Sequence, residues 1–188
     1  MYTDQYQVIR NLVVLDDSIV RGTTLKQSII RIFDRLGPKK IVIVSSAPQI
    51  RYPDCYGIDM ARLGDLIAFK ATVSLLKEKF KENLLDDILE KAIAENLKPL
   101  AEIKNVVKEL YKPFTADQIS EKITQLLRPD DTKAEIQILY QSIEGLHSSC
   151  PNHKGDWYFT GNYPTPGGNK VANQSFINYM QGKNVRAY

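Results

Sequence analysis

The stretch Asn11-Leu-Val-Val-Leu-Asp-Asp-Ser-Ile-Val-Arg-Gly-Thr-Thr24 decides how the rest of this chain is organised. Its apolar run over residues 12–15 predicts a buried strand of a parallel sheet, which ends in two adjacent aspartates. A polar loop follows, and we expect a helix to begin at Thr24, because Gln27 three residues later completes the pattern of a capping box. The order is therefore strand, acidic pair, small-residue loop and helix N-terminus.

Each part of this stretch suits one part of a sugar phosphate. Ligands bind at the carboxyl ends of strands in an open α/β sheet, and the free N–H groups of a helix N-terminus attract phosphate. The hydroxyls of Ser18 and Thr23 add donors, and Gly22 lets the backbone approach closely. Asp16 and Asp17 would repel phosphate but suit ribose hydroxyls or Mg²⁺. An acidic pair alone could simply start a turn or cap a helix. The combination favours a binding site.

The segment Val14-Leu-Asp-Asp-Ser-Ile-Val-Arg-Gly-Thr-Thr24 resembles the phosphoribosyl pyrophosphate (PRPP) signature of type I phosphoribosyltransferases. Within that group, the pair Arg21-Gly22 after the acidic residues is similar to the amidophosphoribosyltransferase family. A second block, Ala47-Pro-Gln-Ile-Arg-Tyr-Pro-Asp-Cys-Tyr-Gly-Ile-Asp-Met60, and the shorter segment Phe159-Thr-Gly-Asn-Tyr-Pro164 resemble later segments of the same family, in the same order.

The resemblance implies a fold, a reaction and a set of site residues. The fold would be the C-terminal part of a type I phosphoribosyltransferase domain, with a Rossmann-like parallel sheet. The reaction would form 5-phosphoribosylamine from PRPP and glutamine-derived ammonia, the first step of de novo purine synthesis. The resemblance gives Asp16 and Asp17 a catalytic role and makes them ligands of a Mg²⁺ cofactor. The PRPP site it implies consists of Asp16, Asp17, Ser18, Ile19, Val20, Arg21, Gly22, Thr23 and Thr24.

Other parts of the family enzyme are expected to lie outside this sequence. The family has a glutaminase domain with a cysteine at its mature N-terminus, whereas this chain begins Met1-Tyr2. Upstream strands and the pyrophosphate loop of the transferase domain are not recognisable either. We therefore expect the missing N-terminal segments to come from the same full-length chain or from a complementing chain. Two or three parallel strands leave an exposed edge, which predicts self-association as a homo-oligomer or a need for that partner.

A helix and a second strand complete the first part of the fold, which is α/β. Residues 24–36 carry apolar side chains at helical spacing, and Gly37 marks the end of the helix. The apolar segment 40–46 predicts a second buried strand, parallel to the first through a right-handed crossover. The loop 47–63 follows that strand, and its candidates for substrate or partner contacts are Arg51, Tyr52, Asp59 and Arg62.

Beyond residue 64 the apolar spacing predicts helices and then an irregular tail. The expected helical stripes lie over 66–80, 84–97, 100–111, 115–126 and 134–146. We divide the chain into residues 1–81, which hold the signature, a helical insert over 82–147, and an aromatic-rich tail over 148–188 that wraps a surface and packs back on the domain. A last short helix is expected over 172–180.

Cysteine and histidine side chains gather in one short segment. Of the two cysteines and two histidines, His147, Cys150 and His153 lie close together, and Cys55 lies in the loop after the second strand. This set could hold zinc as a Cys₂His₂ site. Some members of the resembled family carry an iron–sulfur cluster held in these two regions. This tail lacks their cysteine pair, so we do not expect an Fe–S cluster here.

Composition places the chain among ordinary soluble proteins. Hydrophobic residues make up 43% and charged residues 25%, and the net charge of +3 is too small to indicate a nucleic-acid partner. Neither a signal-peptide pattern nor an apolar run of membrane-spanning length is present, so we expect a cytoplasmic protein with no membrane partner. Two alternatives stay open: a non-catalytic PRPP-binding fragment or regulator, and another type I phosphoribosyltransferase that uses a nucleobase.

Overall fold

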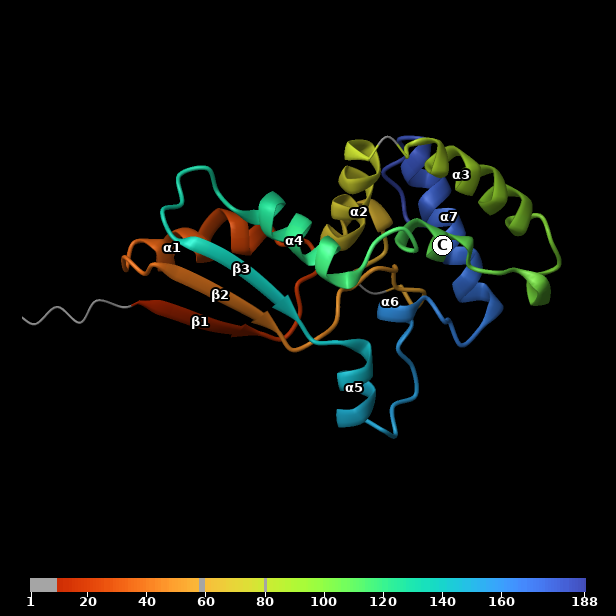
Figure 1. The fold of residues 1–188 in the computed structure, drawn as a ribbon. Coiled ribbons are helices and arrows are strands. Elements are labelled where there is room, and N and C mark those ends of the chain that lie inside the picture. The colour runs from red at the N-terminus through yellow and green to blue at the C-terminus, as the bar shows by residue number, and fades with distance from the viewer. Residues whose placement is uncertain (1–9, 58–59, 80) are drawn as a thin grey trace, which may run out of the picture.

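A three-stranded parallel sheet forms one end of the molecule in the computed structural model, which describes residues 10–57, 60–79 and 81–188. The strands are β1 (Asn11–Asp16), β2 (Lys40–Ser45) and β3 (Glu135–Tyr140), in the order β1-β2-β3 (Figure 1). Both strands predicted from the apolar runs are confirmed, and so is their parallel pairing. All three carboxyl ends therefore meet at one edge of the sheet.

Helices cover only one face of this sheet. A π-helical turn, Leu25–Ile29, leads into α1 (Ile30–Asp34), and α4 (Ala116–Leu127) packs against β3. The side chains between sheet and helices are buried; they include Ile41, Ile43, Ile136 and Ile138 from the strands and Ile30, Ile119 and Ile123 from the helices. The predicted helix over 24–36 is thus confirmed, with one turn wound more widely than an α-helix.

A group of helices lies beyond the carboxyl ends of the strands (Figure 1). It contains α2 (Ile67–Glu78), which packs against α4, and α3 (Asn83–Asn96), which packs against α7 (Pro166–Met180). Short turns of 3₁₀ helix at Leu63–Asp65, Leu100–Glu102 and Val106–Tyr111 connect these helices. The remaining helices are α5 (Ile143–Ser149) and α6 (Trp157–Thr160). No helix in the described ranges is long and apolar enough to cross a membrane.

The helix predicted over 134–146 is wrong for its first half, which is β3. Ile136 and Ile138 are buried, whereas Gln137 between them is half-buried and the flanking Glu135 and Leu139 are exposed, which is the two-residue alternation of a strand. The Glu135 N–H donates to the Lys39 carbonyl oxygen at 2.9 Å, so pairing with the β2 side begins at the first residue of β3. The segment predicted as a helical insert therefore returns to the sheet and supplies its third strand.

The prediction that the first strand is buried is also wrong. Val13 is 61% exposed and Leu15 is 78% exposed, because β1 is an edge strand and its outward face carries no helix. The tail, in contrast, is more ordered than predicted. The helix expected over 172–180 begins six residues earlier, at Pro166, and Phe176 lies fully buried in the core rather than on a surface.

Candidate functional site

Hydrogen bonds fix the loop after β1 to the loop after β2. The Ser46 N–H donates to the Asp16 carbonyl oxygen at 2.9 Å, and the Ala47 N–H donates to the Asp17 carbonyl oxygen at 3.0 Å. The Ser46 hydroxyl adds a bond of 3.1 Å to the Asp17 carbonyl oxygen. These bonds extend the strand pairing past the last residue of β1. The acidic pair therefore leaves the sheet from a defined position at its carboxyl edge.

The two carboxylates differ in environment. Asp17 is exposed, and its Oδ1 accepts a bond of 2.8 Å from the Ser18 N–H. Partial burial of Asp16, followed by its side-chain hydrogen bond with Asp17, raises the pKa of the Asp16 carboxyl above its ordinary value. The neighbouring charge of Asp17 acts in the same direction. The charged form of Asp16 would therefore gain from a cation or hydroxyl donor nearby.

A tyrosine at the end of β3 faces the same edge. Asp16 pairs in register with Ser45, which pairs with Tyr140, so these three residues lie in one row across the strand ends. Burial, with a smaller contribution from the charge of Asp16, raises the pKa of the Tyr140 hydroxyl. That hydroxyl is buried and has no hydrogen-bond partner among the residues that the structure describes. The row thus holds a half-buried carboxylate and a buried hydroxyl at the ends of the outer two strands.

The loop between the acidic pair and the helix is held by contacts with the core, with α2 and with α4. Ile19 is 3% exposed and packs into the core, and the Val20 carbonyl oxygen accepts a bond of 2.8 Å from the Ile67 N–H at the start of α2. Gly22 has φ +70°, and a Cβ there would lie 2.5 Å from Cδ2 of Leu127 in α4. Both the conformation and the contact therefore require glycine at this position.

The helix after the loop begins earlier than predicted. Thr24 already has helical backbone angles, φ −63° and ψ −40°, and its side chain makes no capping hydrogen bond. The expected capping box with Gln27 is therefore wrong, because the Lys26 N–H already bonds to the Gly22 carbonyl oxygen at 3.0 Å. Thr23 and Thr24 are both exposed in the first turn. Their hydroxyls remain available at the positions where a helix N-terminus binds anions.

Positive side chains surround a small cavity at this helix start. The cavity, about 290 Å³ in volume, is lined by Arg21, Gly22, Thr23, Lys26 and Lys70 among others. The Lys26 ammonium donates to the Leu126 carbonyl oxygen at 2.8 Å, which holds it beside the loop. The charge of this cavity suits an anionic group, whereas that of the acidic pair does not.

The loop after β2 uses most of its candidate residues to hold the fold together. The Arg51 guanidinium donates to Gln49 Oε1 at 2.7 Å and lies over the Tyr111 ring, and Tyr52 packs edge-on against the same ring. The Arg62 guanidinium pairs with Asp65 at 2.7 Å. The fourth candidate, Asp59, lies outside the described residues. Sequence reasoning missed Asp54, which is fully buried and whose Oδ1 accepts a bond of 3.0 Å from the Tyr158 hydroxyl.

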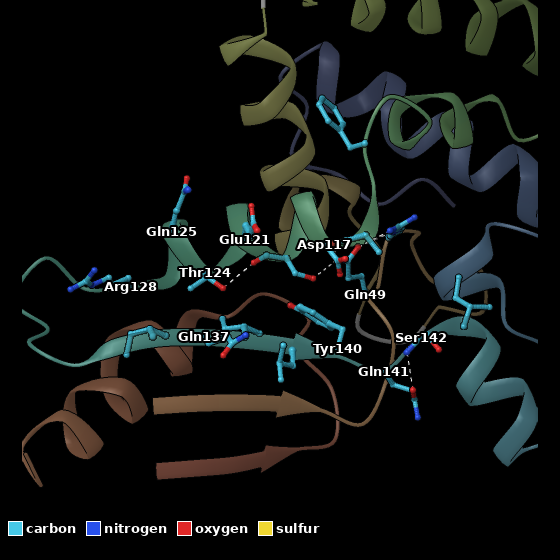
Figure 2. Close-up of a pocket in the computed structure, with 18 of the residues that line it drawn as sticks. Gln49, Asp117, Glu121, Thr124, Gln125, Arg128, Gln137, Tyr140, Gln141 and Ser142 are labelled. Carbon is cyan, nitrogen blue, oxygen red and sulfur yellow. Dashed lines mark hydrogen bonds between the residues drawn. The ribbon is translucent and has the colours of Figure 1, made fainter. Parts of the chain in front are cut away.

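A larger cleft lies between β3 and α4, on the side of the sheet away from the outer strand β1 (Figure 2). Its volume is about 770 Å³, and polar side chains from both elements line it, among them Thr124 and Gln137, which are labelled in Figure 2. Sequence reasoning missed this cleft because it depends on β3, which was predicted as a helix. The strand order separates the cleft wall from β1 by two strand spacings, or about 10 Å.

The predicted cysteine–histidine set is only partly assembled. His147 and His153 stack with ring centroids 4.5 Å apart, and Asp156, which sequence reasoning missed, joins them. Cys150 is exposed and Cys55 is half-buried, and both are free thiols. In the described part of the chain, neither cysteine belongs to a group of three ligand atoms within reach of one ion. Burial, with the charge of Asp54, raises the pKa of the Cys55 thiol.

Comparison with known proteins finds partial sequence matches to proteins of one name. No protein-family model matches the chain. The chain is 35% identical over 130 residues to an amidophosphoribosyltransferase of Escherichia coli, a match that covers 66% of this chain and 26% of that protein. It is 48% identical over 69 residues to the amidophosphoribosyltransferase of Haemophilus influenzae, covering 37% and 14% respectively. With that of Schizosaccharomyces pombe it shares 37% identity over 86 residues, covering 43% and 16%.

Each match covers only a part of the relative's length. The chain spans between 14% and 26% of the length of these three curated proteins, so it corresponds to one portion of them. The three relatives come from two bacteria and a yeast and carry the same name. By sequence, this chain is similar to one portion of amidophosphoribosyltransferases.

Proposed function

We propose that this chain supplies the ribose-5-phosphate part of a PRPP site in an amidophosphoribosyltransferase. The reaction would form 5-phosphoribosylamine from PRPP and glutamine-derived ammonia, at the start of purine synthesis. The observation that supports this most is the arrangement after β1. An acidic pair stands at the carboxyl edge of the sheet, and the helix that follows begins with exposed threonines beside a positively charged cavity.

Two halves of the loop would bind two halves of the substrate. The carboxylates of Asp16 and Asp17 would accept hydrogen bonds from the ribose hydroxyls. The N–H groups and hydroxyls between Ser18 and Thr24 would donate to the 5′-phosphate, with Arg21 and Lys26 adding charge at the cavity. Since the loop is anchored before any ligand arrives, its donors need little rearrangement to bind the substrate.

The acidic pair also fits the Mg²⁺ that the resemblance implies. Magnesium prefers carboxylate oxygens and retains several waters, and Asp17 is exposed enough to allow them. Partial burial, with a further contribution from Asp17, raises the pKa of Asp16, and a bound cation would favour its charged form. Asp16 and Asp17 would hold the ion, which would neutralise charge on the leaving pyrophosphate. The chain's own groups would contribute by positioning the ribose and stabilising its charge, since ammonia needs no general base to attack.

A partner segment would have to complete this site. In the described structure no strand pairs with the outer edge of β1, and the apolar side chains of Val13 and Leu15 on its open face are exposed. The curated relatives are several times longer than the matched region. We therefore propose that an upstream transferase segment, from the same polypeptide or from a complementing chain, pairs with β1 and covers this face.

Calorimetric titration with PRPP and Mg²⁺ tests the proposal on the chain itself. We expect saturable binding that Asp17→Asn reduces at least tenfold, because the ribose hydroxyls lose a charged acceptor. Asp130→Asn is the matched control: it removes the same charge from an exposed loop far along the chain and should leave binding unchanged. Lys133→Ala, also at an exposed position, should have no effect.

The possible outcomes separate the competing functions. Binding without turnover of PRPP and ammonia would favour a non-catalytic PRPP-binding fragment or regulator. Turnover with a nucleobase in place of ammonia would favour another phosphoribosyltransferase. Absence of PRPP binding in a folded chain, or equal loss in Asp17→Asn and Asp130→Asn, would contradict the proposed site.

A further inference from the structure

Three potential metal ligands converge in the segment between α5 and α6. His147 lies on α5, His153 in the loop that follows, and Asp156 immediately before α6. One ligand atom from each lies within 4.8 Å of the other two. Two of them are already in contact, since His147 Nε2 is 2.9 Å from Asp156 Oδ2. The outer two of these residues are nine positions apart, and the three lie on α5, in the loop after it and just before α6.

The distances fit a tetrahedral metal ion. Zinc binds histidine nitrogen and aspartate oxygen at about 2.0–2.2 Å, which places neighbouring ligand atoms about 3.3 Å apart in a tetrahedron. The His147–Asp156 contact of 2.9 Å is close to that spacing, and the widest separation is at most 4.8 Å. The His147 and His153 rings are nearly parallel, with 12° between their planes, so one ring must turn before a nitrogen lone pair of each can point at the same ion.

A second hydrogen bond orients the aspartate for this role. The Thr160 hydroxyl donates to Asp156 Oδ1 at 2.8 Å, which leaves Oδ2 directed at His147. Asp156 is also the more sheltered partner, with a side chain 14% exposed against 39% for His147. A carboxylate that is held through one oxygen and presents the other is the usual arrangement of a metal ligand with its supporting partner.

We propose that His147, His153 and Asp156 form a site for a divalent transition-metal ion of the zinc type, with water in the fourth position. The site lies outside the acidic pair and its loop and does not depend on PRPP binding. It takes nitrogen and oxygen ligands only, which suits Zn²⁺ better than Mg²⁺. Bound metal would tie the C-terminal end of α5 to the start of α6, across the loop 150–156.

This set replaces the four-residue cysteine–histidine site expected from the sequence. Cys150 is exposed and free, and Cys55 is a free thiol of the loop after β2. In the described chain, neither joins the converging group. The three-ligand set therefore differs from the earlier expectation in a property that can be measured: the metal would carry no sulfur ligand.

Titration of the apoprotein with Zn²⁺ and with Co²⁺ tests this proposal. We expect one zinc per chain by calorimetry, and a Co²⁺ absorption spectrum that lacks the thiolate-to-cobalt charge-transfer band. His153→Ala should abolish binding, and Thr160→Val should weaken it about 10–100-fold through the lost support of Asp156. Cys150→Ser and Cys55→Ser are the matched controls and should bind zinc as the unmodified chain does. Circular dichroism of each variant establishes that it is folded.

Each result decides the question. Loss of zinc binding in folded His153→Ala, with binding retained in both cysteine variants, supports the site. Zinc binding that persists in His153→Ala would overturn it. A thiolate band in the Co²⁺ spectrum, or loss of binding in Cys150→Ser, would replace it with a cysteine-containing site. No zinc binding by the unmodified chain would show that the His147–Asp156 contact is a hydrogen bond between side chains and nothing more.

Discussion

The helical end and the sheet end of this molecule differ in how completely they cover their own apolar surface. In the helical end, Phe69, Leu76 and Phe176 are 0% exposed and pack among α2, α3 and α7. At the sheet end, Val13 is 61% exposed and Leu15 is 78% exposed. The first region closes its core with residues of this chain, whereas the described residues leave one apolar sheet face open.

The residues proposed to bind PRPP lie where these two regions meet. Their loop starts from the less covered sheet and is held by helices of both regions, through the close approach of Gly22 to Leu127 of α4 and the bond from the Ile67 N–H of α2 to the Val20 carbonyl oxygen. A large exposed apolar patch on a folded protein commonly marks an interaction surface. The difference therefore suggests a division of labour, in which the helices position the loop and a further polypeptide segment covers the sheet.

Loss of a buried aromatic side chain in the helical end should have the largest effect. Phe176→Ala removes a fully buried ring that meets the Phe69 ring edge-on at 6.3 Å between centroids. We expect the free energy of unfolding to fall by about 3–5 kcal/mol, measured by urea denaturation. Leu97→Ala, at a position 83% exposed in the same region, should change it by less than about 0.5 kcal/mol. Similar losses from the two variants would show that the helical end is not closed.

Glycine substitutions should show how firmly the helices hold the PRPP loop. Gly22→Ala places a side chain at φ +70° against Leu127, so we expect a loss of about 2–4 kcal/mol together with weaker PRPP binding. Gly37→Ala has nearly the same φ, +72°, but meets nothing within 4 Å. It should lose only the backbone contribution of about 1–2 kcal/mol. Equal losses at the two sites would mean that Leu127 does not press on the loop.

The sequence predicted the first two strands of the sheet better than the third, for a physical reason. β1 and β2 each follow a continuous apolar run, and a single helix joins them, so local patterns suffice to predict them. The apolar residues Ile136, Leu139 and Tyr140 of β3, together with Ile143 at the start of α5, also fit a helical spacing. β3 pairs with β2, which lies about 95 residues earlier in the chain, and a local sequence pattern cannot predict such a distant contact.

The two candidate sites also differ in how much of each could be predicted from the sequence. The PRPP loop is one continuous segment, so its composition and order are visible in the sequence. The predicted metal site counted only cysteines and histidines, whereas the ligand atoms that converge in the described residues come from His147, His153 and Asp156. Asp156 stands three residues after His153, and that spacing was the available signal. Which of the nearby side chains converge depends on how the loop between α5 and α6 folds, and this depends on tertiary packing.

A smaller effect, with an informative pH dependence, is expected for Asp16→Asn. The pKa of Asp16 is raised above 3.8 in the folded chain, so the folded state holds this proton more tightly than the unfolded state does. Its contribution to stability is full below pH 3.8 and is lost as pH rises through the raised folded value. Asp16→Asn should therefore raise the urea midpoint at pH 7, with the gain disappearing in acid.

The same substitution should weaken PRPP binding, since asparagine lacks the charge that favours ribose hydroxyls and Mg²⁺. Gained stability with lost binding is the expected cost of crowding two carboxylates at a functional site. Asp130→Asn, at an exposed position, serves as the control for both measurements. A lower midpoint for Asp16→Asn at pH 7 would show instead that the ionised carboxylate stabilises the loop.

The smallest change in stability is expected on the open face of the sheet. Leu15→Ser alters a side chain that is 78% exposed, so the free energy of unfolding should change by less than about 0.5 kcal/mol. Leu12→Ser, on the helix-covered face of the same strand, should cost several times more because Leu12 packs against the core. Sedimentation velocity supplies the second readout, since Leu15→Ser should reduce self-association or capture of an upstream segment. If both substitutions cost the same, the open face is covered within the chain itself, and the proposed need for a partner loses its physical basis.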